Sequence, residues 1–304
     1  MTTRVVRSID EIRNAVTRER SSGRTIGLVP TMGALHAGHA SLIDLARRQT
    51  DCAVVSIFVN PIQFDRTDDY NRYPRALSVD VDFCQARSVD LVFAPAAAEI
   101  YPHPQGAFVE VAPVSEHLCG RFRPGHFRGV ATVVLKLLNI VQPDRAYFGE
   151  KDAQQLAVIR RMVADLNLPV TIVEVPTVRE PDGLALSSRN QHLTPGERRI
   201  APMLNRALQV ARQAIGAGAT APEGVKNEAL RILSQAPEIR LEYLEIVDPG
   251  TMQPVAAISG PVRVALAAWI GNTRLIDNLL CNPEEAQLPA VEEGSGAVTA
   301  SRVS

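Results

Sequence analysis

The stretch TIGLVPTMGALHAGHASLIDLARRQ, residues 25–49, decides the fold class. Its first part, residues 25–30, is a short apolar run of the kind that forms a buried strand. Its last part, residues 40–49, has apolar residues at helical spacing along one face: Leu42, Ile43, Leu45 and Ala46. A strand joined to a helix by a short glycine-containing loop is typical of a parallel sheet. The stretch therefore predicts an α/β fold.

The same alternation continues to about residue 176. Further apolar strands are predicted at residues 52–59, 90–94, 145–148 and 170–175, and helices at residues 79–87, 129–141 and 152–167. Strands that are apolar along their whole length belong to a sheet covered by helices on both faces. We therefore predict a Rossmann-like parallel-sheet domain over residues 1–176.

The sequence changes character after Pro176. A loop at 179–190 precedes predicted helices at 195–215 and 222–234 and strands at 241–247, 262–269 and 274–280. Thr194 is the expected N-cap of the first helix, and Pro195 suits its first turn. We predict a smaller α+β domain over residues 177–282. Residues 283–304 are rich in Glu, Ala, Gly and Ser without a period, and we predict a disordered tail there.

The composition excludes several classes of protein. The chain has 304 residues, with 32 Lys and Arg against 33 Asp and Glu. A balanced charge argues against a general nucleic-acid binder and a polybasic membrane-surface protein. No apolar run approaches the roughly 20 residues that a membrane helix needs. The four cysteines are widely spaced and form neither a zinc signature nor a disulfide framework, so we predict a cytoplasmic protein.

The loop PTMGALHAGH, residues 30–39, carries the strongest chemical signal. It follows a strand, and ligands of parallel sheets bind at the carboxyl ends of the strands. His36 and His39 share a face of the opening helical turn, where imidazole N–H groups and helix N–H groups suit phosphate. Gly38 between them is expected to let a ligand approach the backbone. A helix-capping pair without catalytic meaning is the alternative, and a zinc site lacks a third ligand at any obvious spacing.

These motifs resemble a known family. PTMGALHAGH is similar to the HxGH signature of the nucleotidyltransferase superfamily, and the longer string resembles the pantoate–β-alanine ligase family. The other matching strings are FVNPIQF (58–64), RYPR (72–75), RPGHFRGV (123–130), YFGEKDAQQ (147–155), DGLALSSRN (182–190) and AWIGNTRLIDN (268–278). The strings occur in the family's order, and the resemblance covers about residues 1–282.

The resemblance implies a two-step reaction. Pantoate carboxylate attacks ATP to give pantoyl adenylate and pyrophosphate, and β-alanine then attacks the activated carbonyl to give pantothenate and AMP. It implies ATP and Mg²⁺, the small-molecule substrates D-pantoate and β-alanine, and a homodimer. The alternatives are another HxGH nucleotidyltransferase that adenylates a different small acceptor, an RNA-linked module related to aminoacyl-tRNA synthetases, and a binding protein without catalysis.

The resemblance also assigns residues. Its catalytic, phosphate-contacting set is His36, His39, Lys151, Ser187, Ser188 and Arg189. Its further ATP contacts are Pro30, Met32, Gly149, Asp152, Val178 and Leu186. Its substrate contacts are Met32, Asn60, Gln63, Gln155 and His126, and its Mg²⁺ ligand is Asp80.

Local sequence supports some of these assignments and leaves others open. A lysine is disfavoured at a helix N-terminus, so stability alone explains Lys151 poorly. Asp152 fits equally well as the N-cap of the following helix. For Met32, packing of the loop remains an alternative, and His126 suits a core or surface position as well as a binding role. Asp80 has Val79 and Val81 as neighbours, which weakens its assignment to metal.

Overall fold

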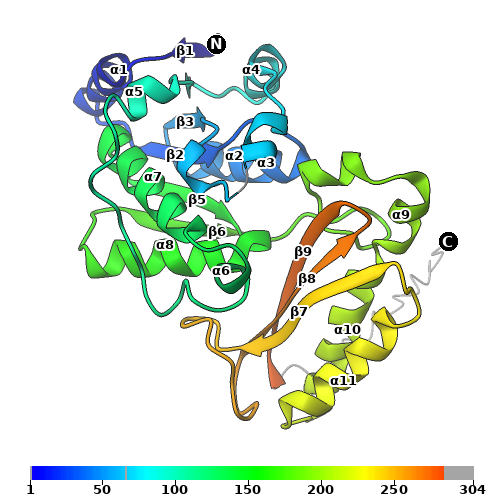
Figure 1. Cartoon of the computed structure of the whole chain (residues 1–304). Helices are drawn as coiled ribbons and strands as arrows, with labels where there is room; N and C mark the ends of the chain where they lie inside the picture. The colour runs from blue at the N-terminus through cyan, green and yellow to red at the C-terminus, as the bar shows by residue number, and fades with distance from the viewer. Residues whose placement is uncertain (1, 66, 284–304) are drawn as a thin grey trace, which may run out of the picture.

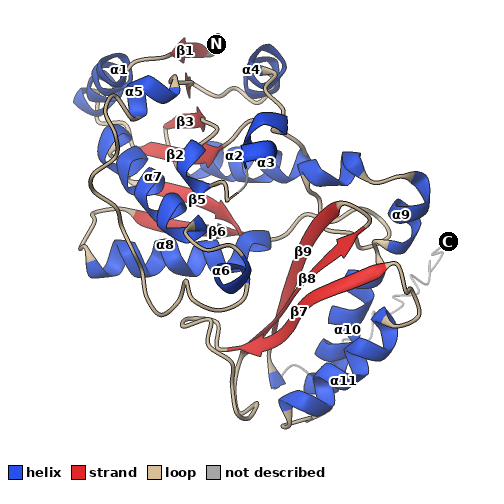
Figure 2. Ribbon diagram, in the orientation of Figure 1, coloured by secondary structure: helices blue, strands red, loops and turns tan. Residues whose placement is uncertain are grey.

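The computed structural model describes residues 2–65 and 67–283. The predicted tail, apart from Pro283, lies outside the described residues. Figures 1 and 2 show two sheets with their own helices: a large one built from the first part of the chain and a small one built from the last. Across the described residues, no helix combines the length and the apolar character needed to cross a membrane.

The large sheet has six strands, all parallel, in the order β1-β4-β3-β2-β5-β6. Their bounds are Arg4–Val6, Leu91–Phe93, Cys52–Ile57, Ile26–Thr31, Arg145–Gly149 and Thr171–Val175 in that order. Strands β2 to β6 correspond to the five predicted ones, so the prediction of an α/β, Rossmann-like sheet is confirmed. The three-residue edge strand β1 and the helix after it are additions that the sequence analysis does not include.

Helices cover both faces of this sheet. Helices α1 (Ile9–Ser21), α7 (His126–Val141) and α8 (Ala153–Asp165) share one apolar core with the sheet, and α2 (Ala37–Gln49) and α4 (Leu77–Gln85) share another. Strand residues alternate between the two cores: Leu28 belongs to the first and Val29 to the second. This alternation explains why the strands are apolar along their whole length.

The order of the strands reverses at β2. From β2 the chain builds β3 and β4 on one side, and it then returns to place β5 and β6 on the other. The loops after β2 and β5 therefore lie side by side at the carboxyl ends of the strands. In open α/β sheets this reversal is where ligands bind. His36 at the end of the β2 loop and His39 in the first turn of α2 lie near Lys151 in the 3-10 turn η2 (Glu150–Asp152).

The small sheet is antiparallel, with β7 (Ile239–Val247), β8 (Val262–Ile270) and β9 (Thr273–Cys281) in that order. Its helices are α9 (Pro195–Ile200), α10 (Met203–Gly216) and α11 (Pro222–Leu233). Helices α10 and α11 bury their apolar faces against the sheet, which closes a separate core. The prediction of a second, smaller α+β domain is confirmed.

The prediction of one helix over residues 195–215 is wrong. Two helices, α9 and α10, occupy this segment, and Ala201 and Pro202 separate them. Proline lacks the N–H that would continue the helical hydrogen bonds, which explains the break. The N-cap prediction is confirmed: the hydroxyl of Thr194 accepts from the amide of Glu197, and the Glu197 side chain accepts from the amide of Thr194.

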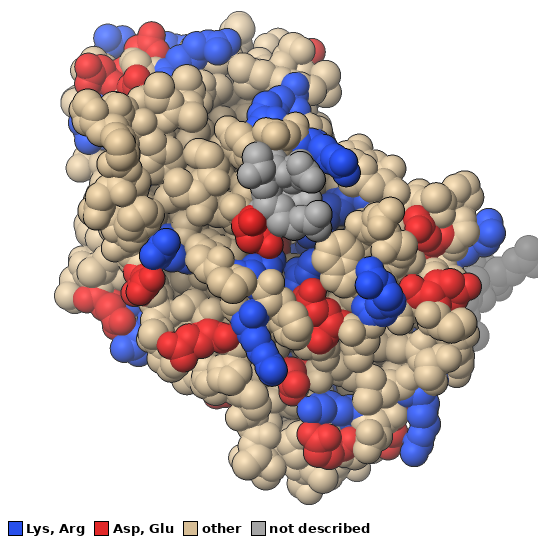
Figure 3. All heavy atoms as spheres, in the orientation of Figure 1, with Lys and Arg blue, Asp and Glu red and all other residues tan. Residues whose placement is uncertain are grey.

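Shorter elements complete the described part of the chain. They are the helices α3 (Thr67–Arg72), α5 (Ala97–Ile100) and α6 (Cys119–Phe122) and the 3-10 turns η1 (Pro61–Gln63) and η3 (Ser188–His192). On the face drawn in Figure 3, positive and negative side chains are interspersed over both halves of the molecule.

Candidate active site

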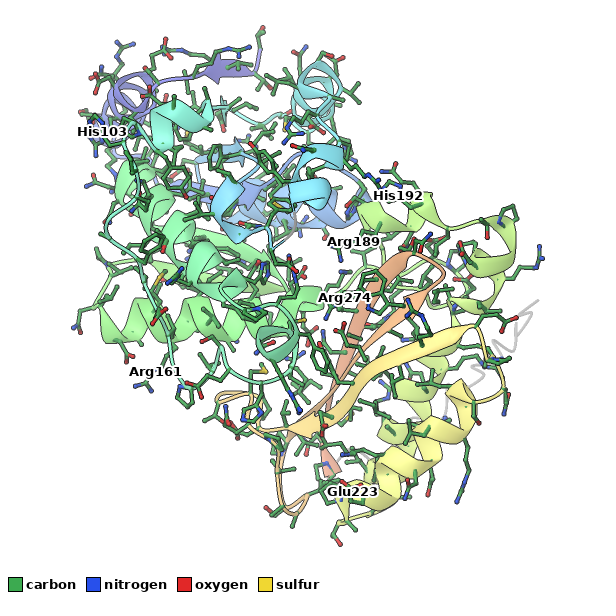
Figure 4. All side chains as sticks on the ribbon, viewed as in Figure 1. His103, Arg161, Arg189, His192, Glu223 and Arg274 are labelled. Carbon is green, nitrogen blue, oxygen red and sulfur yellow. The ribbon has the colours of Figure 1, made fainter. Side chains whose placement is uncertain are left out.

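A cavity of about 330 Å³ opens between the two sheets. With the exception of Asp80, every site residue predicted from the sequence lines it. These residues are Pro30, Met32, His36, His39, Asn60, Gln63, His126, Gly149, Lys151, Asp152, Gln155, Val178, Leu186, Ser187, Ser188 and Arg189. In Figure 4, Arg189 and Arg274 lie at the junction of the two halves, whereas His103 and Glu223 lie on outer surfaces. One cavity thus collects polar groups from strands that are distant in sequence.

The two histidines cap helix α2. Nδ1 of His36 accepts a hydrogen bond from the amide of Gly38 at 3.1 Å, and the amide of His36 donates to Nδ1 of His39 at 3.2 Å. The ring centroids are 4.2 Å apart. Because each Nδ1 acts as an acceptor, the proton of each neutral ring resides on Nε2. Capping therefore leaves both Nε2–H groups as donors for a ligand.

Gly38 makes room for the His36 ring. A Cβ atom at this position would lie 2.9 Å from Cε1 of His36. The His36 ring, which folds back over the helix N-terminus, fills this space, and the approach of a ligand to the Gly38 backbone stays a prediction. The glycine of the H-x-G-H pattern thus permits the capping geometry.

Burial keeps both rings neutral. It lowers the pKa of His39 to about 3, with the neighbouring His36 as a further cause. Burial, followed by the Lys151 ammonium, lowers the pKa of His36 as well. Near pH 7 the pair therefore offers neutral donors, and Lys151 supplies positive charge nearby. Within the described residues Lys151 makes no ion pair, which leaves its ammonium available to an anion.

Asp80 has a structural role besides the metal role predicted for it. It is buried on α4, and its two carboxylate oxygens accept the backbone amides of Ala34 at 3.0 Å and Leu35 at 2.8 Å. No group of three or more potential metal ligands occurs among the described residues. The described side chains therefore do not form a site that holds Mg²⁺ by protein ligands alone, and Asp80 as one ligand of an ATP-bound Mg²⁺ ion stays a prediction. The carboxylate holds the loop that leads into His36.

Asn60 and Gln63 form an ordered pair of amides on and before η1. The Asn60 amide nitrogen donates to Oε1 of Gln63 at 2.9 Å and to the Gly129 carbonyl at 3.1 Å, and its oxygen accepts from Tyr101 at 2.8 Å. Because Oε1 of Gln63 is occupied, the Gln63 side chain presents its Nε2 donors to the cavity. One of them meets the Met32 sulfur at 3.1 Å. Asn60 thus orients Gln63.

Neighbouring glutamines at the start of α8 have different surroundings. The Gln154 amide accepts from the amide of Cys119 and donates to the carbonyls of Val114 and His117, so it fixes the loop before α6. Gln155 lines the cavity, and within the described residues its side chain has no hydrogen-bond partner. Asp152 occupies the N-cap position of α8, but its side chain makes no capping hydrogen bond.

The Ser187–Arg189 loop follows a short hairpin. The hydroxyl of Ser187 accepts from the amide of Arg189 at 3.2 Å and caps η3. Ser188 lies beside the hydroxyl of Tyr73, whose pKa is raised by burial. The Arg189 guanidinium donates to the Arg274 carbonyl at 3.3 Å. Tyr73 comes from the first domain, so this loop contacts both halves of the cavity.

His126 begins α7 and supports an arginine that the sequence analysis did not single out. Its Nδ1–H donates to the Gln63 carbonyl at 2.8 Å, and its Nε2 accepts from Arg123 at 3.2 Å. Burial, and then Arg123, lower the pKa of His126 to about 4. Arg123 also pairs with Asp65 at 2.9 Å and lines the cavity. The neutral imidazole is thus a support for the guanidinium.

Other cavity residues were missed although their motifs were noted. Tyr73, Arg274, Asp277 and Asn278 belong to the RYPR and AWIGNTRLIDN strings and line the cavity. The sequence does contain a signal for two of them, because Asp277 and Asn278 interrupt an apolar stretch of β9. Both side chains are buried in the structure. Buried polar side chains require partners, so their presence in a strand marks a specific contact.

Comparison with known proteins agrees with this arrangement. The sequence profile of the family described as "Pantoate-beta-alanine ligase" matches residues 4–280. The chain is 52% identical over 276 residues to the "Pantothenate synthetase" of Moorella thermoacetica, covering 91% of this chain and 98% of that protein.

Two solved structures share the fold. The pantothenate synthetase of Thermus thermophilus has a TM-score of 0.86 at 48% identity, covering 90% of this chain and 98% of the other. The pantoate-β-alanine ligase of Francisella tularensis, complexed with "Beta-gamma ATP and Beta-alanine", has a TM-score of 0.73 at 37% identity, covering 91% and 97%. The chain therefore belongs to the pantoate–β-alanine ligase family.

Proposed function

We propose that this cavity joins D-pantoate to β-alanine at the expense of ATP, through a pantoyl adenylate. The observation that supports the proposal most is the composition of one cavity: phosphate-type donors from both domains next to two primary amides, Gln63 and Gln155. The Francisella relative, whose structure holds an ATP analogue and β-alanine, supports the same ligands here.

In the first step a pantoate carboxylate oxygen attacks the α-phosphorus of ATP. The bond from that phosphorus to the bridging oxygen breaks, and pyrophosphate leaves. Two anions must approach each other, so the step depends on fixed donors and cations aimed at the phosphates. We assign the Nε2–H groups of His36 and His39, the Lys151 ammonium and the Ser187–Arg189 loop to this task.

Pantoate fits the part of the cavity near η1. Asn60 fixes Gln63 so that its Nε2 faces the cavity, and Gln155 is without a protein partner among the described residues. Amide groups of this kind hydrogen bond to a carboxylate or hydroxyl. Met32 and Phe64 provide apolar surface beside them for the geminal methyl groups of pantoate.

In the second step the neutral amine of β-alanine attacks the acyl carbon. The bond from that carbon to the AMP oxygen breaks, and the nitrogen loses a proton. We assign Arg123, held between Asp65 and His126, to the carboxylate of β-alanine, because a fixed guanidinium pairs well with a carboxylate. His126 positions Arg123, since its Nε2 lone pair already accepts from that guanidinium.

The remaining assignments concern ATP and the assembly. We place the nucleoside against Pro30, Gly149, Asp152, Val178 and Leu186, and we propose that residues 177–282 close over it as a lid on residues 1–176. Mg²⁺ would arrive bound to the phosphates of ATP, because Asp80 is committed to backbone amides. A homodimer and a cytoplasmic location remain predictions from the sequence.

Exchange between ATP and labelled pyrophosphate tests the proposal. We expect exchange that depends on D-pantoate, and AMP release that depends on adding β-alanine. Exchange without pantoate would favour the alternative, a nucleotidyltransferase acting on a different small acceptor. No exchange under any of these conditions would refute the assignment of His36, His39 and Lys151 to the phosphates.

A further inference from the structure

Strand β9 carries two neighbouring polar residues, Asp277 and Asn278, within an otherwise apolar run from Leu275 to Cys281. Asp277 and Asn278 are 4% and 5% exposed, so both are removed from water. Burying a carboxylate and an amide is costly unless each is fully hydrogen bonded. Strand β9 runs along the junction of the two domains, and it contacts both η2 and η3 (Figure 1). The partners of these two residues show what the strand holds together.

Asn278 hydrogen bonds to the backbone of the turn that carries Lys151. Its amide nitrogen donates to the carbonyl of Glu150 at 3.1 Å and to the carbonyl of Lys151 at 2.9 Å. Its amide oxygen accepts from the Arg263 guanidinium, which also pairs with the Glu150 carboxylate at 3.1 Å. The second domain thus fixes the backbone of η2, although η2 belongs to the first domain.

Asp277 forms an ion pair with the hairpin that leads to the Ser187–Arg189 loop. Its two carboxylate oxygens form a bidentate pair with Arg179, at 2.7 and 2.9 Å. Arg179 also donates to the carbonyl of Gly183 at 3.1 Å. A φ of +92° at Gly183, together with Asn205 2.8 Å from where a Cβ would lie, restricts this turn to glycine. The hairpin is therefore rigidly built and attached to β9.

The two contacts are coupled to each other. The amide of Asn278 donates to Oδ1 of Asp277 at 2.8 Å, which is the same oxygen that accepts from Arg179. One dipeptide therefore connects the backbone of Lys151 in the first domain to the loop of Arg189 in the second. Lys151 and the Ser187–Arg189 loop, which the proposed function assigns to the ATP phosphates, thus share one support.

We propose that Asp277 and Asn278 are positioning residues for adenylation: they set Lys151 against the Ser187–Arg189 loop when the two domains are in contact. This inference rests on the proposed function of the cavity. Neither residue need touch ATP, because each acts through a backbone or an arginine partner. A displacement of about 1 Å in a catalytic group costs on the order of 100-fold in rate, so a support of this kind controls catalysis without touching the substrate.

A double-mutant cycle in the first half-reaction tests the role of Asn278. Pantoate-dependent ATP–pyrophosphate exchange is measured for wild type, Asn278→Ala, Lys151→Ala and the double variant, with single-turnover formation of pantoyl adenylate where exchange is slow. We expect Asn278→Ala to lower kcat about 10- to 100-fold. The KM for pantoate should stay within about 2-fold, because Gln63 and Gln155 are held by other elements. In the Lys151→Ala background the same change should cost less than about 3-fold.

A matched control comes from the next residue of β9. Leu279 packs against the core of the second domain and is not among the cavity-lining residues. Leu279→Ala should lower thermal stability while leaving the exchange kcat unchanged. Asn278→Asp provides a second test variant, since it keeps the size of the side chain and an oxygen toward Arg263 but turns the two donors into an acceptor facing carbonyls. It should lower kcat at least as much as Asn278→Ala.

A corresponding test applies to Asp277. Asp277→Asn keeps the shape but weakens the ion pair with Arg179, so we expect the KM for ATP to rise several-fold with the KM for pantoate unchanged. Equal losses for Asn278→Ala with and without Lys151, or a kcat loss in Leu279→Ala as large as in Asn278→Ala, would overturn the inference. Wild-type protein without pantoate-dependent exchange would instead refute the proposed function, so the two failures are distinguishable.

Discussion

The lowered pKa values of two cavity histidines, His39 and His126, predict that the free energy of unfolding depends on pH. Burial lowers the pKa of His39 from 6.5 to about 3 and that of His126 from 6.5 to about 4. In the unfolded chain both imidazoles regain the ordinary value. As pH falls below 6.5, the unfolded state binds protons that the folded state does not, so the free energy of unfolding falls.

The size of the effect follows from these values. One pKa unit corresponds to about 1.36 kcal/mol. A pH of 5 lies about 1.5 units below the pKa of each unfolded imidazole, so the unfolded rings are protonated, whereas the folded rings are still neutral. Each histidine therefore removes about 2 kcal/mol between pH 7.5 and pH 5, and the two together about 4 kcal/mol. The contribution is fully present above pH 6.5 and is lost progressively toward pH 4 for His126 and pH 3 for His39.

Urea unfolding at pH 7.5 and pH 5.0 measures this loss. The double variant His39→Asn/His126→Asn removes the two titrating groups while retaining an acceptor or a donor near each Nδ1 position. We expect its difference in unfolding free energy between the two pH values to be smaller than that of wild type by about 4 kcal/mol. His103→Asn, on an outer surface (Figure 4), controls for loss of an imidazole as such. Equal pH dependence in wild type and in the double variant would refute the reasoning.

Three further predictions concern single residues of the site. Lys151→Ala should lower the kcat of pyrophosphate exchange by about 100- to 1,000-fold. It should change the free energy of unfolding by less than about 0.5 kcal/mol, because the Lys151 ammonium has no ion pair within residues 2–65 and 67–283. A loss of kcat within a few-fold would contradict the phosphate role of Lys151. Gln63→Ala should raise the KM for pantoate about 10-fold or more and leave the KM for ATP nearly unchanged; the reverse pattern would overturn the substrate assignment. Asp80→Asn should lower kcat about 10-fold or more and leave the Mg²⁺ concentration for half-maximal activity unchanged, since the carboxylate holds the amides of Ala34 and Leu35; a strongly raised Mg²⁺ requirement would restore the metal assignment.

The parallel sheet was predictable because its strands are buried on both faces. Apolar runs such as Cys52–Ile57 carry that information locally, whereas the three-residue strand β1 is too short to give a pattern. The break between α9 and α10 carried a visible signal in Pro202, but the amphipathic period on both sides of it favoured one helix. Where the order of the strands reverses is a property of the whole chain, and no local pattern reveals it.

The residues that bind a ligand and the residues that hold them are different kinds of prediction. Motif position was sufficient to bring His36, Lys151 and Arg189 into one cavity, because each follows a strand or a domain junction. The family resemblance assigned Asp80 to metal, but an isolated carboxylate near phosphate-type residues fits a ligand and a support equally well. Its two backbone contacts show the supporting role, and contacts between residues 45 and 46 positions apart in the chain cannot be read from a local sequence pattern.

The histidine pair shows why capping and catalysis should not be treated as competing explanations. A capping role uses Nδ1 of each ring, and a phosphate role uses Nε2, so the first fixes the tautomer that the second requires. Replacing either histidine by alanine removes both functions together and cannot separate them. Asparagine at position 36 or 39 retains an acceptor near Nδ1 without the distal N–H. If the phosphate role is correct, such variants keep the helix start and lose adenylation, whereas a pair that serves only as a cap would tolerate asparagine in both properties.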